Sequence, residues 1–283
     1  MDHWKEQTQA VTGESKMEGL TFLHNNAKED IESIGLVFEP NFFTGYFYAD
    51  SHAKKLMAYK VFDSTVPLLS HEIKALRPLF AITFKGDYTL VPLAVFNESE
   101  AGKYLAFNTS ADEHEAEWDR IIGLETVIIY QRDKKSEKSI ESVFPGLRLK
   151  HGVGSFLEFC RQQENSEAEA FLHQSGNSFD LAIFHKSKLI FANSIHSDHP
   201  EDVRYFILYT LKTLDLKPET PLNMLGGASK NDKVIALLKP YMPNIKQVSI
   251  HNNSEHNILK PAGVDPRFTS TNWAGIYASQ CAL

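Results

Sequence analysis

The residues best suited to binding a ligand are two adjacent glycines between an apolar run and a helix-like segment. The stretch Leu225-Gly226-Gly227-Ala228-Ser229 follows the apolar residues from Leu222. Glycines there let a ligand approach the backbone, and a helix N-terminus offers unpaired N–H groups to an anion. An ordinary strand-to-helix turn shows the same pattern, because one Gly-Gly pair is a weak motif. Gly226, Gly227 and Ser229 are therefore candidate ligand-binding residues, with a plain turn as the alternative.

A second glycine-containing segment is His151-Gly152-Val153-Gly154-Ser155, which also precedes a helix-like run. It lacks the third glycine of the dinucleotide-binding fingerprint. The sequence Gly-x4-Gly-Lys-Ser/Thr, which cradles phosphates in P-loop proteins, does not occur in the chain. We interpret this segment as an ordinary turn.

Catalytic and metal-binding patterns are weak throughout the sequence. His196-Ser197-Asp198-His199 and the stretch 251–256 hold metal-capable side chains in expected loops, where backbone geometry seldom fixes ligands. The chain contains no Gly-x-Ser-x-Gly elbow and no His-Glu-x-x-His motif, and no expected helix pairs carboxylates on one face. Cys160 and Cys281 form no Cys-x-x-Cys pair. We therefore expect no catalytic residue and no metal site.

The composition is that of a folded protein without a nucleic-acid or membrane signature. The 283 residues are 42% hydrophobic and 23% charged, with a net charge of −7. No lysine and arginine stripe alternates with aromatic residues, so we expect no nucleic-acid partner. The first residues lack the basic-then-apolar order of a signal peptide, and no run approaches about 18 apolar residues. We expect a cytoplasmic protein, not inserted in a membrane, with a protein partner.

The apolar runs of the first half predict mainly strands. Residues 1–17 are polar and aperiodic, which predicts a disordered tail. We first expect a meander of strands at Leu20–Leu23, Gly35–Phe38, Phe42–Ala49 and Lys55–Phe62, followed by a helix over Val66–Leu76. Next come strands at Leu79–Phe84 and Tyr88–Val91, which Lys85-Gly86-Asp87 is expected to join as a hairpin. A helix capped by Asn97 and a strand at Glu125–Tyr130 complete this half.

The second half alternates strands with helices, which predicts a layered α/β unit. A helix from Ser155 is expected to grow more polar toward Gly176 and to bridge the two halves. After this helix we expect a hairpin of Phe179–Phe184 and Leu189–Ile195 around His185–Lys188. A helix from Pro200 is expected to bury Phe206, Ile207 and Leu211. The remaining expected elements are a strand at Leu222–Leu225, a helix at Asp232–Lys239, a strand at Gln247–Ile250 and a closing helix within Phe268–Leu283.

Three stretches together resemble a known family. They are Tyr88–Asn97 with the following Ala101-Gly-Lys-Tyr-Leu, Phe179-Asp180-Leu-Ala-Ile-Phe through Asn193, and Pro200–Leu208 with Leu222-Asn-Met-Leu-Gly-Gly. As an ordered set they resemble a family of uncharacterised bacterial proteins, a domain of unknown function, with an actin-like ATPase (ASKHA-type) fold. The resemblance covers most of residues 20–283.

This resemblance implies an α/β fold of two-lobed actin-like ATPase (ribonuclease H-like) architecture, with mixed sheets flanked by helices. The expected lobes are residues 18–154 and 155–283, with a nucleotide cleft between them. In the wider superfamily a Gly-Gly-x-Ser-like turn holds the adenosine, and Gly226-Gly227-Ala228-Ser229 matches it. The superfamily also carries Asp-x-Gly in the opening hairpin turn of each lobe, around the phosphates.

The expected hairpin turns do not carry that phosphate pattern. The second-lobe turn His185–Lys188 and the first-lobe residues His24-Asn25-Asn26 contain neither the aspartate nor the glycine, and Asp180 lies inside a strand. Phosphoryl transfer needs carboxylates for magnesium and for the attacking water. The first hypothesis is thus a non-catalytic scaffold or protein-interaction module without a cofactor. A nucleotide-binding protein or weak ATPase that binds ATP in the cleft is the alternative, and a metal-dependent hydrolase the third.

Overall fold

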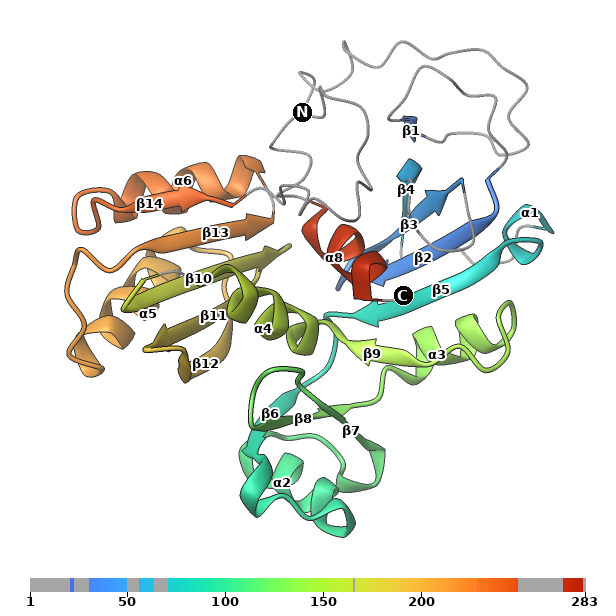
Figure 1. Ribbon diagram of the computed structural model, residues 1–283, viewed down its shortest axis with the longest axis horizontal. Coiled ribbons are helices and arrows are strands. Elements are labelled where there is room, and N and C mark those ends of the chain that lie inside the picture. The colour runs from blue at the N-terminus through green and yellow to red at the C-terminus, as the bar shows by residue number, and fades with distance from the viewer. Residues whose placement is uncertain are drawn as a thin grey trace.

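The computed structural model describes residues 21–22, 31–49, 56–63, 71–164, 166–226, 228–248 and 272–281 (Figure 1). Within these residues the strands form two large mixed sheets and one small antiparallel sheet. The expected disordered tail at 1–17 lies outside the described residues.

The first large sheet has the strand order β1-β4-β3-β2-β5-β9. Its strands are β1 (Thr21–Phe22), β2 (Ser33–Phe38), β3 (Phe42–Tyr48), β4 (Leu56–Asp63), β5 (Arg77–Thr83) and β9 (Leu149–His151). β2, β3 and β4 pair antiparallel in chain order, which confirms that part of the predicted meander, but β1 pairs with β4 and not with β2. β5 and β9 add in parallel on the other side of β2. Every residue of β2 is buried, as expected of a central strand covered on both faces.

The second large sheet repeats this plan with the order β12-β11-β10-β13-β14. Its strands are β10 (Ala168–Ser175), β11 (Ser178–His185), β12 (Lys188–His196), β13 (Leu222–Gly226) and β14 (Ile245–Gln247). Three antiparallel strands are again followed by parallel ones, and the crossovers carry the helices α5 (Pro200–Thr213) and α6 (Ala228–Leu238). The predicted β11–β12 hairpin is confirmed. β14 lies nearer the N-terminus than predicted and overlaps that prediction only at Gln247.

A small subdomain is inserted between β5 and β9. It contains β6 (Tyr88–Pro92), β7 (Ala116–Arg120) and β8 (Thr126–Gln131) in the order β6-β8-β7. Between β6 and β7 lie the short turns η1 (Leu93–Val95), η2 (Glu98–Glu100) and η3 (Glu113–Glu115) and the helix α2 (Ala101–Asn108). We call residues 88–131 the insertion. It extends away from both large sheets (Figure 1) and has a small apolar core of its own.

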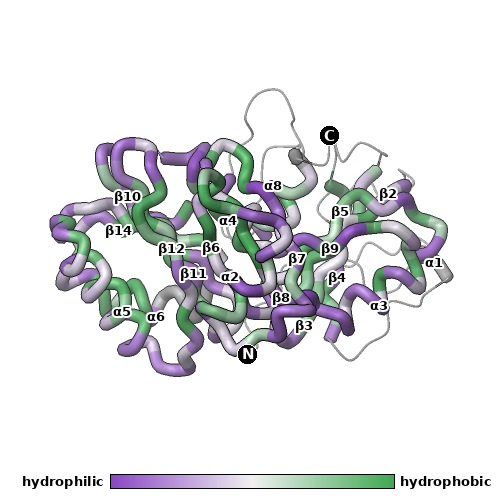
Figure 2. Tube along the Cα trace, turned by 90° about the horizontal axis from the view of Figure 1, so that it is seen from below, coloured by the Kyte–Doolittle hydropathy of each residue, from purple (hydrophilic) through white to green (hydrophobic). Residues whose placement is uncertain are grey.

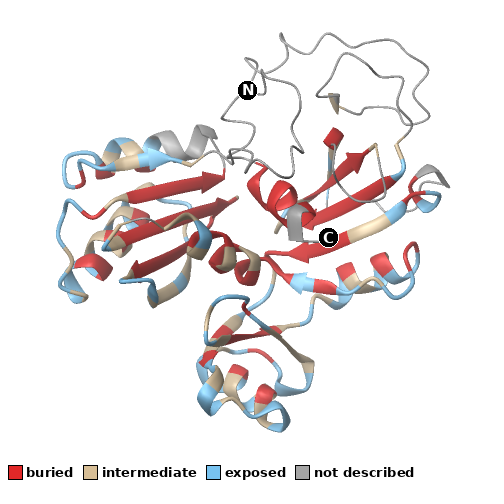
Figure 3. Ribbon diagram, viewed as in Figure 1, coloured by how far each residue is buried: buried red, intermediate tan, exposed pale blue. Residues whose placement is uncertain are grey.

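Two helices fill the space between the large sheets. α4 (Gly152–Gln163) and α8 (Trp273–Cys281) lie between the large sheets and are mostly buried (Figure 3). Their side chains belong to one buried cluster that also includes side chains from both sheets. α8 confirms the predicted closing helix. It packs against the first sheet through Gly275, where an added Cβ would lie 2.4 Å from the Tyr46 ring, and Tyr46 donates a hydrogen bond to Asn272 at 3.0 Å.

The charged run after β8 is mostly helical. Its residues form α3 (Lys134–Glu141), capped by Asp133, whose carboxylate accepts from the backbone N–H of Ser136. Hydrophilic residues dominate this helix (Figure 2), and Ile140 is the apolar side chain that anchors it in the first-sheet core. The helix α1 (His71–Lys74) covers the end of the predicted helix Val66–Leu76, and residues 64–70 lie outside the described residues.

The predicted hairpin around Lys85-Gly86-Asp87 is wrong. β5 belongs to the first large sheet, whereas β6 pairs with β8 in the insertion. Gly86 adopts a φ of 91°, and an added Cβ would lie 2.9 Å from the carbonyl oxygen of Gln131. Gly86 therefore does form the turn that the sequence predicts, but β6 pairs with β8, which lies further along the chain, and not with β5.

The predicted continuation of the Ser155 helix toward Gly176 is also wrong. α4 ends at Gln163, and Ala168–Ser175 form β10, the central strand of the second sheet. β10 carries polar residues that are buried and paired by side chains from other strands: Asn223 donates to Glu169 at 2.7 Å, and His173 bonds Asp180. The strand could not be recognised from the sequence, because its polar residues are buried whereas a hydropathy pattern treats polar residues as exposed.

The predicted buried face of α5 is only partly correct. Ile207 and Leu211 are buried, with exposed fractions of 0% and 4%. Phe206 is only half-buried and packs at the margin of the core, with its ring centroid 6.2 Å from that of Phe191. The helical spacing identified the face correctly, but Phe206 lies at its edge.

The β11–β12 turn offers a simple stability test. Lys186 and Ser187 both adopt positive φ values, 50° and 63°, in a two-residue turn between the paired residues His185 and Lys188. Such turns favour glycine or asparagine, because other residues pay a steric penalty in this region. We expect Ser187→Gly to raise the free energy of unfolding by about 0.5–1 kcal/mol in urea titrations. Gly176→Ala, at a φ of 63° in the β10–β11 turn, should lower it. A destabilised Ser187→Gly protein would contradict the assigned backbone geometry.

Candidate functional site

The candidate site lies where the opening hairpins of the two large sheets meet. β2 and β3 are joined by Glu39-Pro40-Asn41, and β10 and β11 by Gly176-Asn177. The Glu39 carboxyl lies close enough to His173 and Ser175 at the end of β10 for both to lower its pKa. Ligands of open α/β sheets bind beyond the carboxyl ends of parallel strands, and β10 ends here.

This geometry corrects the expected location of the opening hairpins. The hairpin that opens the second sheet turns at Gly176-Asn177, and His185–Lys188 is the next turn along the chain. In the first sheet the turn that faces the second lobe contains Glu39, and His24-Asn25-Asn26 lie outside the described residues. The second-sheet turn therefore does contain a glycine, and the first-sheet turn does contain an acid.

Glu39 has an unusual electrostatic environment. Burial raises the pKa of its carboxyl to about 7, against the opposing effects of His173 and Ser175. Its side chain is half-buried, and the buried Ser175 hydroxyl has no hydrogen-bond partner at full bonding distance among the described residues. A carboxyl with this pKa is partly protonated at neutral pH, so it holds a proton that it can share with a ligand or a neighbour.

A chain of hydrogen bonds continues from His173 into the second lobe. His173 Nδ1 lies 3.0 Å from Asp180 Oδ2, and the Ser194 hydroxyl donates to Asp180 Oδ1. Because Ser194 has given its single proton to Asp180, the Tyr88 hydroxyl must donate to Ser194, at 2.9 Å. Tyr88 belongs to β6, so this chain ties the insertion to the second sheet. Burial raises the pKa of Tyr88 far above its usual range, which keeps it protonated.

The arrangement differs from a nucleophilic triad. Ser194 bonds the aspartate and not the histidine, so His173 cannot take its proton during an attack. Three aromatic rings surround His173: its centroid is 4.6 Å from that of Phe84, 5.7 Å from Phe156 and 5.0 Å from Trp273. Both oxygens of Asp180 are already engaged, which makes Asp180 an anchor for the network.

The second glycine segment serves packing. Gly152 begins α4, and an added Cβ would lie 2.5 Å from the Phe84 ring. His151 caps this helix, since its Nδ1 accepts the Val153 N–H at 3.3 Å. Burial lowers the pKa of His151 to about 4, so the ring stays neutral and able to accept that bond. The ordinary-turn interpretation of this segment agrees with these contacts.

The predicted ligand residues Gly226, Gly227 and Ser229 are only partly described. Gly226 is the last residue of β13, opposite Gln174 of β10, with a φ of 87°. A Cβ there would lie 2.2 Å from the Gln174 carbonyl oxygen, so the backbone itself requires glycine. Gly227 lies outside the described residues, and Ser229 is in α6 with its side chain not described. Their role in binding adenosine stays a prediction. Gly226 does lie beside the end of β10, at the candidate site.

The histidine-rich loops form no metal centre in the part of the chain that the structure describes. His196 and His199 are exposed, and no group of three histidine, cysteine or acidic side chains among the described residues has metal-binding geometry. The stretch 251–256 is not described. In the same described part, no helix is both long and apolar enough to cross a membrane.

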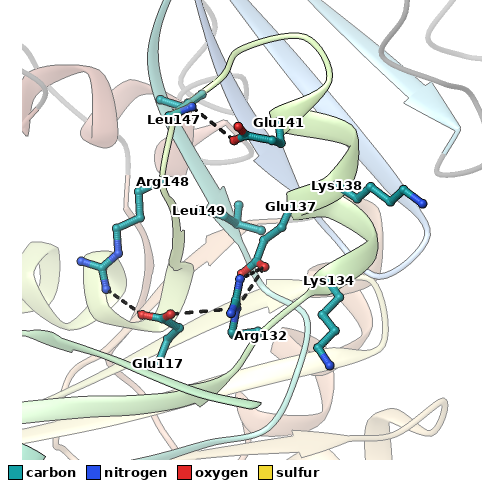
Figure 4. Close-up of a pocket in the computed structure, with 10 residues that line it drawn as sticks. Glu117, Arg132, Lys134, Glu137, Lys138, Glu141, Leu147, Arg148 and Leu149 are labelled. Carbon is teal, nitrogen blue, oxygen red and sulfur yellow. Dashed lines mark hydrogen bonds and ion pairs between the residues drawn. The ribbon is translucent and has the colours of Figure 1, made fainter. Parts of the chain in front are cut away.

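A charged pocket of about 600 Å³ lies between the insertion and α3 (Figure 4). Arg132 makes a two-pronged contact with Glu137, at 2.8 Å for the closest pair of atoms, and Arg148 contacts Glu117 at 3.4 Å and Asp119 at 2.8 Å. Both arginines are exposed and the three acids are half-buried, and ion pairs near the surface contribute little each. Of these contacts, those of Arg148 link the insertion to the residue that precedes β9 of the first sheet.

Sequence reasoning missed Glu39 and His173. A signal for the first was present, because Glu39-Pro40-Asn41 separates two strands that were both predicted. Gly176-Asn177, which follows soon after His173, likewise indicates a turn between two strands, although the sequence pattern alone also fits the end of a helix.

Two lobes with the same meander-plus-parallel order, packed around shared helices, define the actin-like ATPase fold, and comparison with solved structures agrees. A Bacteroides thetaiotaomicron protein described as having an actin-like ATPase fold and unknown function matches with a TM-score of 0.66 at 17% identity, over 78% of this chain and 92% of that one. A PilM–PilN type IV pilus biogenesis complex matches with a TM-score of 0.55 at 14% identity, over 89% and 98%.

The chain belongs to the family described as protein of unknown function (DUF3822), whose model matches residues 80–245. The predicted resemblance to an uncharacterised family with this fold is therefore confirmed. No curated protein is similar enough in sequence to match. The division of the chain at residues 154 and 155 stays a prediction.

Proposed function

We propose that this protein is a non-catalytic protein-interaction module that uses the actin-like ATPase fold as a scaffold. The observation that carries the proposal is that Asp180 and Glu39, the acids where the two lobes meet, are hydrogen-bonded or partly protonated. Asp180 is bound by Ser194 and His173 through its two oxygens, and the pKa of Glu39 is raised to about 7. Magnesium binds ionised carboxylates. Asp180 could bind magnesium only by breaking its hydrogen bonds to Ser194 and His173, and Glu39 only by losing its proton.

The structural comparison supports the binding part of this proposal. The PilM–PilN match is a complex between two proteins, and its fold extends over most of both chains compared. At 14% identity this likeness concerns the fold and leaves the partner of the present chain to experiment.

A nucleotide-binding protein or weak ATPase is the alternative function. One observation favours it: Gly226 ends β13 directly beside the end of β10, where the turn Gly176-Asn177 begins. A nucleotide on this edge would meet backbone N–H groups of that turn and the start of α6.

We expect the purified protein to release no phosphate from ATP and magnesium above the rate of a protein-free control. The measurement is a steady-state phosphate assay at neutral pH, with Asp180→Ala in parallel and equal activity expected from both. A nucleotide present at about 100 times its dissociation constant would add about 2.7 kcal/mol to stability, which a thermal-shift titration detects. Stabilisation without hydrolysis would support the alternative. Steady phosphate release that disappears in Asp180→Ala would overturn the non-catalytic assignment.

A further inference from the structure

The insertion carries most of the net charge of the protein. Its residues 88–131 include eight aspartates and glutamates but only two basic residues, Lys103 and Arg120, for a net charge of −6 out of the −7 of the whole chain. The remainder of the chain is therefore nearly neutral. A compact subdomain of this charge strongly favours cationic partners over anionic ones.

Seven of the eight acidic residues of the insertion form two groups, and the eighth, Glu125, directly precedes β8. Three lie toward the first lobe and are paired there by bases outside the insertion: Glu115 with Lys134, and Glu117 and Asp119 with Arg148. The other group flanks α2. It consists of Glu98 and Glu100 in η2 and of Asp112 and Glu113 at η3, and both turns contact α2.

The acids beside α2 are poorly neutralised. Glu100 pairs with Lys103 at 2.6 Å, and Glu113 lies 3.7 Å from the exposed His114. Within the described part of the chain, Glu98 and Asp112 have no basic side chain at ion-pair distance. The outer end of the insertion is thus a surface with unsatisfied negative charge.

Large apolar side chains are exposed on the same surface. Phe107, at the end of α2, has an exposed fraction of 89%, and Val95 in η1 has one of 63%. Tyr104 lies between them: its hydroxyl donates to the Val95 carbonyl at 2.8 Å, and it precedes Phe107 by three residues, which places the two on one helix face. Val95, Tyr104 and Phe107 therefore lie on one side of α2, and we call these three residues the α2 strip.

We propose that the α2 strip and its flanking acids bind a basic amphipathic helix of a partner protein. This rests on the proposed function and names its docking surface. Exposed apolar side chains gathered on one surface mark interaction sites, and apolar residues bordered by acids fit the apolar face of a helix flanked by lysine or arginine. The same acids repel anionic lipid surfaces and nucleic-acid phosphates. The charge of this surface therefore favours binding of a basic protein segment.

The test uses the full chain and a fluorescein-labelled 15-residue peptide of leucine and lysine in amphipathic helical order. Two control peptides are a scrambled isomer and an analogue with glutamate in place of lysine. Fluorescence anisotropy should show binding of the amphipathic basic peptide alone, weakened at least tenfold between 20 and 300 mM salt. We expect Phe107→Ser to weaken binding at least tenfold. Glu98→Gln with Asp112→Asn should weaken it less and reduce its salt dependence.

The matched control is Tyr205→Ser, which removes an exposed aromatic side chain, 67% accessible against 89% for Phe107, from α5 in the other lobe. It should bind the peptide as the parent does. Equal binding by Phe107→Ser and the parent, equal loss in Tyr205→Ser, or equal binding of the glutamate peptide would each overturn the docking surface. The phosphate assay distinguishes the two proposals: no peptide binding with no ATP hydrolysis refutes the surface alone, whereas ATP hydrolysis refutes the non-catalytic scaffold.

Discussion

Replacing Trp273 with alanine is expected to lower the free energy of unfolding by about 3–5 kcal/mol, the range for a large buried aromatic residue. Trp273 is fully buried at the start of α8. Its ring lies 6.1 Å from Phe84 of the first lobe, 5.5 Å from Phe159 of α4 and 5.0 Å from His173 of the second sheet, measured between centroids. One side chain thus contacts both lobes and the helix between them.

Urea titration followed by circular dichroism measures this loss. Trp273→Phe is the informative control: it keeps most of the apolar contact and removes an indole N–H that is buried without a partner among the described residues, so it should cost much less. Tyr209→Ala, at an exposed position of α5, should change stability by less than about 0.5 kcal/mol. A loss below about 1 kcal/mol in Trp273→Ala would show that the two lobes do not depend on this contact.

The second large effect is a pH dependence that Glu39 imposes on stability. The pKa of its carboxyl is about 7 in the folded protein, against 4.5 for an unperturbed glutamate. The folded state therefore binds this proton more tightly, and the stabilisation present below pH 4.5 is lost as the pH rises through 7. We expect Glu39→Gln to match the parent near pH 5. At pH 8 it should be more stable by roughly 1–3 kcal/mol, since each unit of pKa corresponds to about 1.4 kcal/mol.

The measurement is the difference in unfolding free energy between Glu39→Gln and the parent, across pH 5 to 8. His151 titrates in the opposite sense: its pKa of about 4 means that its contribution is present above pH 6.5 and is lost as the pH falls. Because both proteins contain His151, its effect cancels in the difference. Glu98→Gln, at an exposed position, serves as the control and should show no such trend. A constant difference across this range would refute the raised pKa of Glu39.

Local sequence signals identified most secondary structure where the apolar pattern and the environment agreed. The β11–β12 hairpin has two apolar runs around a polar turn, and the buried face of α5 follows helical spacing. Signals of this kind fail when the partner is distant. The glycine turn between β5 and β6 predicts that these two strands pair, whereas β6 pairs with β8, which comes after α2 and η3.

The sequence by itself determined the α/β class and the hairpin and helix face of the second half, because these depend on periodicity and on local turn residues. It marks Gly226 only as a turn or ligand residue, and the contact with Gln174 in the structure shows that glycine is required there. Only the tertiary structure decided the candidate site. It buried polar residues of β10 by giving them partners from other strands, and it brought Glu39 of the first lobe to His173 and Ser175 of the second. The physical reason is that burial of a polar side chain costs little only when a hydrogen-bond partner is present, and the partners of Glu169 and His173 come from other strands.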